Sequence, residues 1–197
     1  MPASGILFII SAPSGTGKNT IVEVFLNLYP DLNMSRFITY TTKKPRLGDV
    51  QGKDYHFISV HEFEQKIQEG FFLEYSLAYG NYYGSAASMI TRLEQGSSFF
   101  LIIDRDGADR IAQLYKHHIL IWVTPPSLQE LEARLIKRAG EAPEDIKKRL
   151  MLASIEIELE QATPLYKYHI TNEHINESVS QLYSIVSLYV LGHNLES

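Results

Sequence analysis

The chain has 197 residues, 45% of them hydrophobic, which suits one domain with a sizeable hydrophobic core. It has no cysteine, which excludes disulfides, thiolate metal sites and a cysteine nucleophile and suits a reducing, cytoplasmic setting. The net charge of −5 argues against a general nucleic-acid binder, and no apolar run is long enough for a signal peptide or a membrane span. We therefore expect neither nucleic-acid nor membrane partners, and the sequence leaves the oligomeric state open.

A buried strand, a glycine-rich turn and a helix are expected at the start of the chain. The apolar run at residues 7–10 predicts the strand, and helical spacing predicts the helix over residues 18–28. Backbone N–H groups of such a turn, together with the helix N-terminus, surround an anionic phosphate, and a lysine adds a point charge. The turn therefore predicts an ATP-binding phosphate loop (P-loop), formed by Ala12, Pro13, Ser14, Gly15, Thr16, Gly17, Lys18, Asn19 and Thr20.

The loop departs from the usual P-loop pattern at two positions. Ala12 stands where the pattern has glycine, which is a mild change if the backbone has negative φ there. Asn19 stands where a serine or threonine normally binds magnesium, and an amide oxygen is a bulkier ligand than a hydroxyl. Thr20 does not replace that hydroxyl, because the next residue points about 100° away around the helix.

Strands and helices alternate along the rest of the chain, with a mobile connection expected at 139–144. Strands are expected at 37–40, 55–59, 71–79, 99–104, 119–123 and 168–171, and helices at 60–69, 86–95, 108–115, 128–138, 144–162 and 177–191. Ser59 and Glu62 form a capping-box pattern before the helix at 60–69. The continuous apolar runs at 99–103 and 119–123 predict parallel strands covered on both faces. This pattern predicts an α/β fold with a P-loop NTPase-type parallel sheet flanked by helices.

A second group of polar residues indicates an acceptor that carries a phosphate. Between residues 39 and 57, hydroxyls and cations crowd around a turn, where Arg46 can bind a phosphate bidentately and Lys43 offers a point charge. Glu74 interrupts an apolar strand, and a Gly-Asn turn with paired tyrosines follows at 80–85. Taken together, two phosphate-type sites and an acidic, aromatic pocket predict a kinase for a small phosphorylated acceptor.

The chain resembles the guanylate kinase family from the P-loop to about Asn172. The family's threonine-pair, Arg-x-Pro-Arg-x-Gly-Glu stretch is matched by residues 41–49, and its Gly-Asn-Tyr-Tyr-Gly motif is matched outright by residues 80–84. Pro125, Pro126 and Ser127 match the opening of the family's lid helix. The spaced arginines of the lid are matched by Arg134, Arg138 and Arg149.

The resemblance implies transfer of a phosphoryl group from ATP to GMP, with Mg²⁺ as cofactor. It implies a P-loop core at 1–34, 89–125 and 151–197, an inserted mixed α/β GMP-binding lobe at 35–88 and a helical lid at 126–150. It places the GMP phosphate on Lys43, Arg46, Tyr55 and Tyr83, and the guanine among Thr39, Glu74 and Ser85. It also places Asp104 near the metal together with Asn19, and Asn172 near the adenine. Catalysis is expected from Lys18, Arg46, Arg134, Arg138 and Arg149.

Several residues depart from the family pattern. Lys43 replaces the usual arginine, so that one bidentate clamp becomes a point charge. Thr39 stands where serine is common, and Ile102 where many members have an aspartate that receives the guanine amino group. Asp106 stands where the family usually has glutamine.

Three other functions compete with this interpretation. Asn19 and Ile102 slightly favour a non-catalytic phosphopeptide-binding module, although the intact Gly15-Thr16-Gly17-Lys18 run argues against it. A sugar-phosphate kinase would not need Glu74 or the complete threonine-pair stretch. A nucleic-acid binder that uses residues 36–53 lacks an extended basic stripe.

Overall fold

Two β-sheets organise the residues that the computed structural model describes, which are 4–46, 48–78, 80–137 and 142–193; they form one five-stranded and one four-stranded sheet. The chain divides into two compact units. The first contains Met1–Leu7 and Met34–His118, and the second contains Phe8–Asn33 and Ile119–Ser197. The glycine-rich loop lies in the second unit, whereas the segment from Thr39 to Ser85 lies in the first.

The second unit contains nearly all of β1 and β8 and the whole of β9, in the order β1-β8-β9 within the five-stranded sheet. β1 (Leu7–Ser11) is buried along its whole length, and β8 (His118–Thr124) is buried except at its two ends. β9 (Tyr168–Thr171) pairs in parallel with β8. Burial on both faces explains why β1 and the centre of β8 are apolar without alternation.

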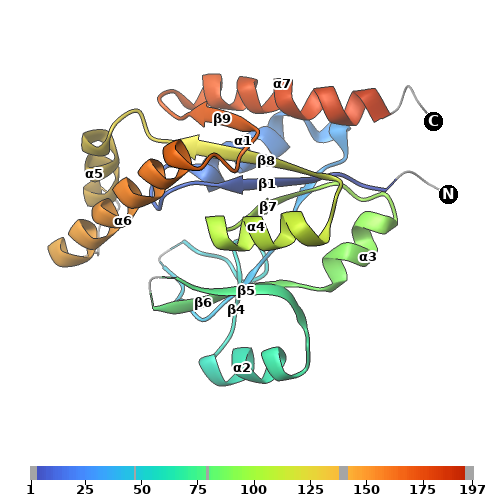
Figure 1. The fold of residues 1–197 in the computed structure, drawn as a ribbon, viewed down its shortest axis with the longest axis horizontal. Helices are drawn as coiled ribbons and strands as arrows, with labels where there is room; N and C mark the ends of the chain where they lie inside the picture. The colour runs from blue at the N-terminus through green and yellow to red at the C-terminus, as the bar shows by residue number, and fades with distance from the viewer. Residues whose placement is uncertain (1–3, 47, 79, 138–141, 194–197) are drawn as a thin grey trace. The chain divides into compact units, whose positions relative to one another are not determined.

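The helices of the second unit form two pairs. α1 (Lys18–Leu28) packs against α7 (Ile175–His193), which also contacts β9 (Figure 1). α5 (Leu128–Lys137) packs against α6 (Pro143–Ala162) through Leu131, Leu135 and Ala153. The two leucines are four residues apart and therefore lie on one face of α5. A short 3-10 helix (Pro30–Leu32) follows α1.

The first unit contains the four-stranded sheet, whose strands follow the order β4-β3-β6-β5. Its strands are β4 (His56–Phe57), β3 (Tyr40–Thr41), β6 (Asn81–Ala86) and β5 (Phe72–Ala78). β3 and β4 are parallel, whereas β6 runs antiparallel to both β3 and β5. The unit also contains β2 (Ser35–Arg36) and the buried β7 (Phe99–Ile102), which pair in parallel.

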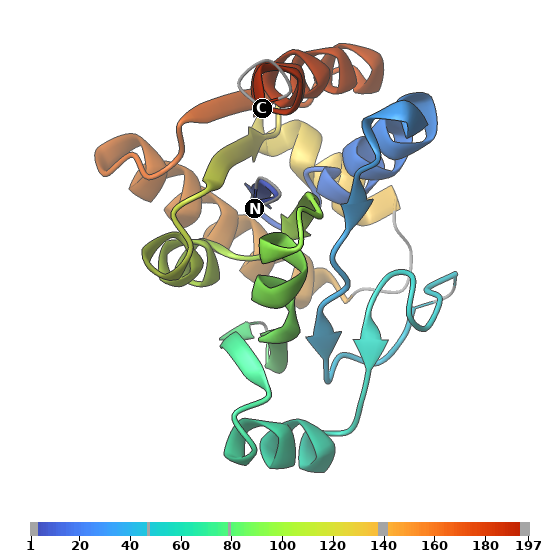
Figure 2. The ribbon, with the colours of Figure 1, turned by 90° about the vertical axis from the view of Figure 1, so that its right-hand side faces the viewer.

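Three helices accompany the strands of the first unit: α2 (Val60–Gln68), α3 (Ser88–Glu94) and α4 (Arg105–Leu114). The expected cap of α2 is confirmed, since Ser59 Oγ accepts a hydrogen bond from the Glu62 N–H at 3.1 Å. Phe63 of α2 stacks on Phe72 and Tyr82, with ring centroids 4.3 and 5.0 Å apart. These ring contacts hold α2 against the strands of the four-stranded sheet, and Figure 2 shows the path of the backbone through this unit.

The expected elements agree with the structure except around the four-stranded sheet. The single strand expected at 37–40 is wrong, because the chain forms the separate short strands β2 and β3 there. The turn expected at 80–85 is also wrong in extent: Gly80 has φ 73°, but the strand β6 begins at Asn81. The expected connection at 139–144 falls largely outside the described residues, although α6 already begins at Pro143. No helix in the described part of the chain combines the length and apolarity needed to cross a membrane.

Candidate active site

The loop between β1 and α1 needs glycine at two positions. Gly15 and Gly17 have φ of 98° and 94°, in the left-handed region that side chains disfavour. A Cβ atom on Gly17 would lie 2.5 Å from Asn172 Nδ2, and one on Gly15 would lie 2.9 Å from Leu131 Cδ1. Both the backbone angle and the lack of space therefore exclude side chains at these positions, where Asn172 and Leu131 pack directly against the loop.

Lys18, the first residue of α1, folds back over this loop. Its Nζ donates a hydrogen bond to the carbonyl oxygen of Ala12 at 2.8 Å. Asn33 is the only non-glycine residue with positive φ within the described ranges, so Ala12 occupies the first glycine position without strain. The alanine at position 12, where the P-loop pattern has glycine, therefore leaves the geometry of the loop intact.

A cavity of about 530 Å³ opens beside the loop, within the second unit. Its lining includes Gly15, Gly17, Thr20, Arg134, Asn172 and His174. This volume falls in the range of small-molecule and cofactor sites. The cavity therefore provides space for a nucleotide next to the P-loop.

Asn172 connects β9 to the P-loop. Its side chain, 6% exposed, donates from Nδ2 to the Thr16 carbonyl oxygen at 2.6 Å. Ser178 of α7 in turn donates from Oγ to Asn172 Oδ1 at 3.0 Å. Asn172 thus lies in the cavity wall and also fixes the backbone of the loop.

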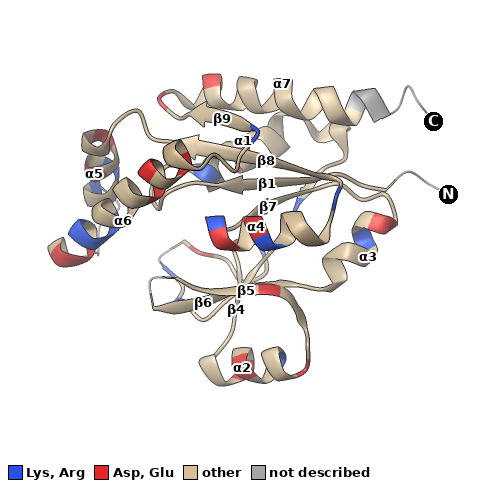
Figure 3. Cartoon of the chain, in the orientation of Figure 1, with Lys and Arg blue, Asp and Glu red and all other residues tan. Residues whose placement is uncertain are grey.

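The helix pair α5–α6 brings one arginine directly to the P-loop. Arg149 Nη1 donates to Ser14 Oγ at 2.6 Å. Arg134 lines the cavity and pairs with Glu130, with 3.0 Å between Nε and Oε1. Figure 3 shows basic and acidic residues on both helices, and many of these, such as Glu132, Lys147 and Lys148, are exposed and belong to a solvated surface. Arg138 lies outside the described residues, so its expected position beside Arg134 remains a prediction.

A buried carboxylate marks the candidate base pocket in the first unit. Glu74 of β5 is 5% exposed and accepts a hydrogen bond from Ser85 Oγ of β6 at 2.7 Å. Burial raises the pKa of Glu74 to about 7, and the nearby Asp104 charge acts in the same direction. Such a group can accept hydrogen bonds from a ligand that presents two N–H donors side by side.

Asp104 lies in the same unit as this pocket. Its Oδ2 accepts from Ser76 Oγ at 2.5 Å, and its Oδ1 accepts from the Gly107 N–H at 2.8 Å as the cap of α4. A Cβ atom on Gly107 would lie 3.0 Å from Glu74 Oε2 and 3.2 Å from Asp104 Oδ1. The two carboxylates therefore flank Gly107, and this glycine keeps the space between them open.

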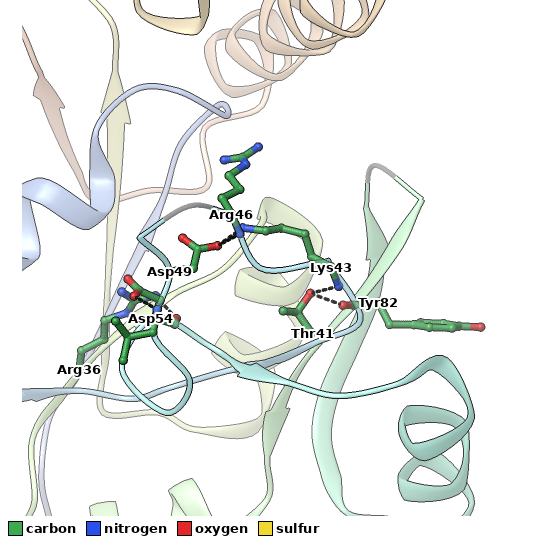
Figure 4. Close-up of polar contacts among 8 residues, drawn as sticks. Arg36, Thr41, Lys43, Arg46, Asp49, Asp54 and Tyr82 are labelled. Atoms are coloured by element: carbon green, nitrogen blue, oxygen red, sulfur yellow. Dashed lines mark hydrogen bonds and ion pairs between the residues drawn. The ribbon is translucent and has the colours of Figure 1, made fainter. Parts of the chain in front are cut away.

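The candidate phosphate residues cluster on the segment that joins β3 and β4. Lys43 Nζ lies 2.9 Å from Asp49 Oδ2, which also accepts from the Arg46 N–H at 2.9 Å (Figure 4). The Arg46 guanidinium points away from the Asp49 carboxylate in the same view. Tyr55 contacts Tyr83 edge to face, with ring centroids 6.0 Å apart.

Comparison with known proteins decides the family. A family model described as guanylate kinase matches residues 4–189. The chain belongs to the guanylate kinase family. A guanylate kinase of Clostridium tetani is 41% identical, over 93% of this chain and 86% of its own length. One of Protochlamydia amoebophila is 44% identical, over 92% and 90%. The crystal structure of guanylate kinase from Anaplasma phagocytophilum, 29% identical, gives a TM-score of 0.75 and covers 95% of this chain and 87% of that one.

Both the resemblance and the P-loop α/β fold expected from the sequence are confirmed. The residues expected for the guanylate kinase GMP site all lie in the first unit: Thr39, Lys43, Arg46, Tyr55, Glu74, Tyr83 and Ser85. Those expected for ATP, residues 12–20 and Asn172, all lie in the second. Asn19 and Asp104 belong to different units, so their joint metal role remains a prediction, as does the division into core, GMP-binding lobe and lid.

Two residues of the site, Ser76 and Ser178, were missed in the sequence, and the contact made by a third, Asp49, was not expected. Ser76 lies two residues after Glu74 on β5, so period-two alternation places both on one face and could have revealed it. Asp49 was noted within the motif, but its contact with Lys43 depends on the turn between them. Nothing in the sequence indicates that Ser178 belongs to the site, because single serines are common in helices.

The raised pKa of Glu74 predicts a pH-dependent stability. Its folded pKa of about 7 lies above the ordinary 4.5, so its contribution is fully present below 4.5 and is lost as the pH rises through 7. We expect the free energy of unfolding to fall by up to about 3 kcal/mol over that window. Urea unfolding of wild type and Glu74→Gln at several pH values measures it. Parallel pH curves for the two proteins would contradict the expectation.

Proposed function

We propose that the loop at residues 12–20 binds ATP and that the residues around Lys43 and Glu74 bind GMP. As a guanylate kinase family member, the chain transfers the terminal phosphoryl group of ATP to GMP, giving ADP and GDP. The observation that carries the GMP assignment is the buried Glu74 carboxylate, paired with Ser85 beside the Gly-Asn-Tyr-Tyr-Gly motif. Guanine presents its ring N1–H and 2-amino group side by side, which matches a carboxylate acceptor.

The ATP site is proposed to combine the loop backbone with Lys18, Arg149 and the cavity wall. The short hydrogen bond from Arg149 to Ser14 supports a role for this arginine at the ATP phosphates. Arg134 borders the same cavity. Asn172 is proposed to contact adenine and, in addition, holds the P-loop through its hydrogen bond to the Thr16 carbonyl oxygen. Arg138 is proposed to act with Arg134 on the strength of its spacing alone.

The proposed mechanism relies on alignment and charge rather than on a general base. The attacking oxygen belongs to the GMP phosphate, which is largely dianionic at neutral pH because its second pKa is about 6. Charge on the transferring group must then be balanced, which is the proposed role of Lys18 and the arginines. Arg46 and Lys43 would hold the acceptor phosphate in position.

Magnesium fits this site as an ion shared with the nucleotide. Within the described ranges, no cluster of three or more histidine, aspartate or glutamate side chains could hold a metal by itself. Mg²⁺ commonly uses one or two protein groups together with substrate phosphates and waters. Asn19, in the first turn of α1 beside Lys18, would offer an amide oxygen, and the bound ion would neutralise phosphate charge.

Asn19→Ser tests this magnesium assignment. If the amide is a poor replacement for the usual hydroxyl, we expect the variant to reach half-maximal activity at a lower magnesium concentration than wild type. Magnesium titrations at saturating ATP and GMP make the comparison, and Asn27→Ser, the same change at an exposed residue of α1, serves as the matched control. Coinciding curves for Asn19→Ser and wild type would mean that Asn19 does not contact the ion.

A coupled ADP-release assay with GMP, AMP, dTMP and ribose phosphates tests the assigned substrate. We expect turnover with GMP far above the other acceptors. A phosphopeptide-binding module would release no ADP, and a sugar-phosphate kinase would prefer a ribose phosphate. Family membership favours neither alternative.

A further inference from the structure

The lysine of the candidate phosphate site already has a carboxylate partner within the protein. Lys43 Nζ donates to Asp49 Oδ2 at 2.9 Å, and the same oxygen accepts from the Arg46 backbone N–H at 2.9 Å (Figure 4). The Asp49 N–H donates to the Arg46 carbonyl oxygen at 3.0 Å, which closes the turn. The turn thus presents a negative oxygen to the cation that should receive the substrate phosphate.

The pair is partly shielded from water. The side chains of Lys43 and Asp49 are 17% and 21% exposed, and the ammonium lies 5.2 Å from the ring centroid of Tyr55. Burial acts to raise the pKa of Asp49, but the hydrogen bonds from Arg46 and Lys43 outweigh it, so that this pKa lies below its usual range. Asp49 is therefore ionised at neutral pH.

We infer that Asp49 is an internal counterion that competes with the acceptor phosphate for Lys43 and thereby sets the affinity for GMP. The inference rests on the proposed GMP site. The ammonium has three donors, so an anion can bind beside Asp49, but the carboxylate offsets the lysine charge and repels the anion. An anion therefore binds more strongly when the Lys43–Asp49 pair is open, and the apparent affinity rises with the open fraction. A phosphate dianion, with twice the charge and three oxygens, displaces a single carboxylate better than a monovalent anion does.

The arrangement also lowers occupancy of the site by free anions. A lysine without a partner would attract chloride, carboxylates and inorganic phosphate as well as the substrate. A carboxylate held in place by the Arg46 N–H lowers occupancy by all of them. The ratio of affinities is unchanged, but a nucleotide with further contacts still binds after this loss, whereas a free anion held by Lys43 alone no longer occupies the site.

Asp49→Asn isolates the charge, because the amide keeps an oxygen for the Arg46 N–H. We expect the KM for GMP to fall about two- to fivefold, the range expected for loss of a partly exposed ion pair, with kcat little changed. Competitive inhibition by inorganic phosphate should strengthen by a similar or larger factor. Asp54→Asn is the matched control: Asp54 also accepts a backbone N–H, that of Val50 at 2.8 Å, and the charge change is the same.

A double-mutant cycle shows whether the effect passes through Lys43. In a Lys43→Gln background, Asp49→Asn should lower the KM for GMP by a clearly smaller factor, because only the repulsion between Asp49 and the phosphate is removed and no ammonium is released. An unchanged or higher KM for Asp49→Asn alone would overturn the inference, as would the same decrease in Asp54→Asn. A wild-type protein without GMP-dependent ADP release would instead contradict the proposed function, so the two failures are distinguishable.

Discussion

Lys18→Ala should abolish phosphoryl transfer and leave the fold intact. The ammonium lies over the P-loop, bound to the Ala12 carbonyl oxygen, where the terminal phosphates of ATP are expected. Charge develops on the transferring phosphoryl oxygens, and a fixed cation in this position stabilises it more than it stabilises the bound ATP. We expect kcat to fall by about 10³-fold or more.

The fold should survive because Lys18 is half-buried at a helix N-terminus rather than part of the core. Lys148→Ala on α6 is the matched control, since Lys148 is an exposed lysine in the same unit, next to Arg149. Circular dichroism and thermal unfolding establish that both variants are folded, and ADP release measures activity. Substantial GDP formation by folded Lys18→Ala protein would contradict the assignment of the ATP site.

The parts of the fold predicted from sequence are those fixed by local chemistry. β1 and α1 follow from an apolar run, a glycine-rich turn and helical spacing, and the Ser59 cap of α2 follows from two residues three apart. In β6 the signal failed, because Gly80 and Asn81 are turn residues and the following tyrosines carried no alternation. Its strand character comes from pairing with β3 and β5, which no local pattern specifies.

Site residues were predicted in kind, but their contacts were not. The sequence identified Asn172 by its motif position, yet its hydrogen bond to Thr16 joins segments 156 residues apart in the chain, which no local pattern specifies. The proximity of Lys43 and Asp49 depends on a turn at Gly48, whose φ of 92° lets the carboxylate fold back toward Arg46. The residues that bind a ligand can thus be identified from motifs, whereas the residues that they contact within the protein depend on how the chain folds.

Glu74→Ala should remove nearly all preference for GMP over AMP. A carboxylate accepts both N–H donors of guanine but would face the lone pair of adenine N1. Sites that pair a buried polar group with a substrate can reject the wrong substrate by up to about 10⁴-fold. Ile102, buried at the end of β7, has no acceptor for the remaining amino hydrogen. Glu74 should therefore carry most of the discrimination.

Comparison of Glu74→Gln with Glu74→Ala separates the effect of losing the charge from the effect of losing the side chain. Its amide keeps an oxygen that can accept the Ser85 hydroxyl, but it turns one acceptor toward the ligand into a donor, which suits adenine better than guanine. We therefore expect both variants to lose turnover with GMP, and Glu74→Gln to show the higher ratio of AMP to GMP turnover. Competition kinetics with both nucleotides measures the ratio, with Glu64→Gln on the exposed side of α2 as the control for charge. If Glu74→Ala retains its preference for GMP, guanine is recognised elsewhere, because the variant has no carboxylate at this position to accept the two N–H donors.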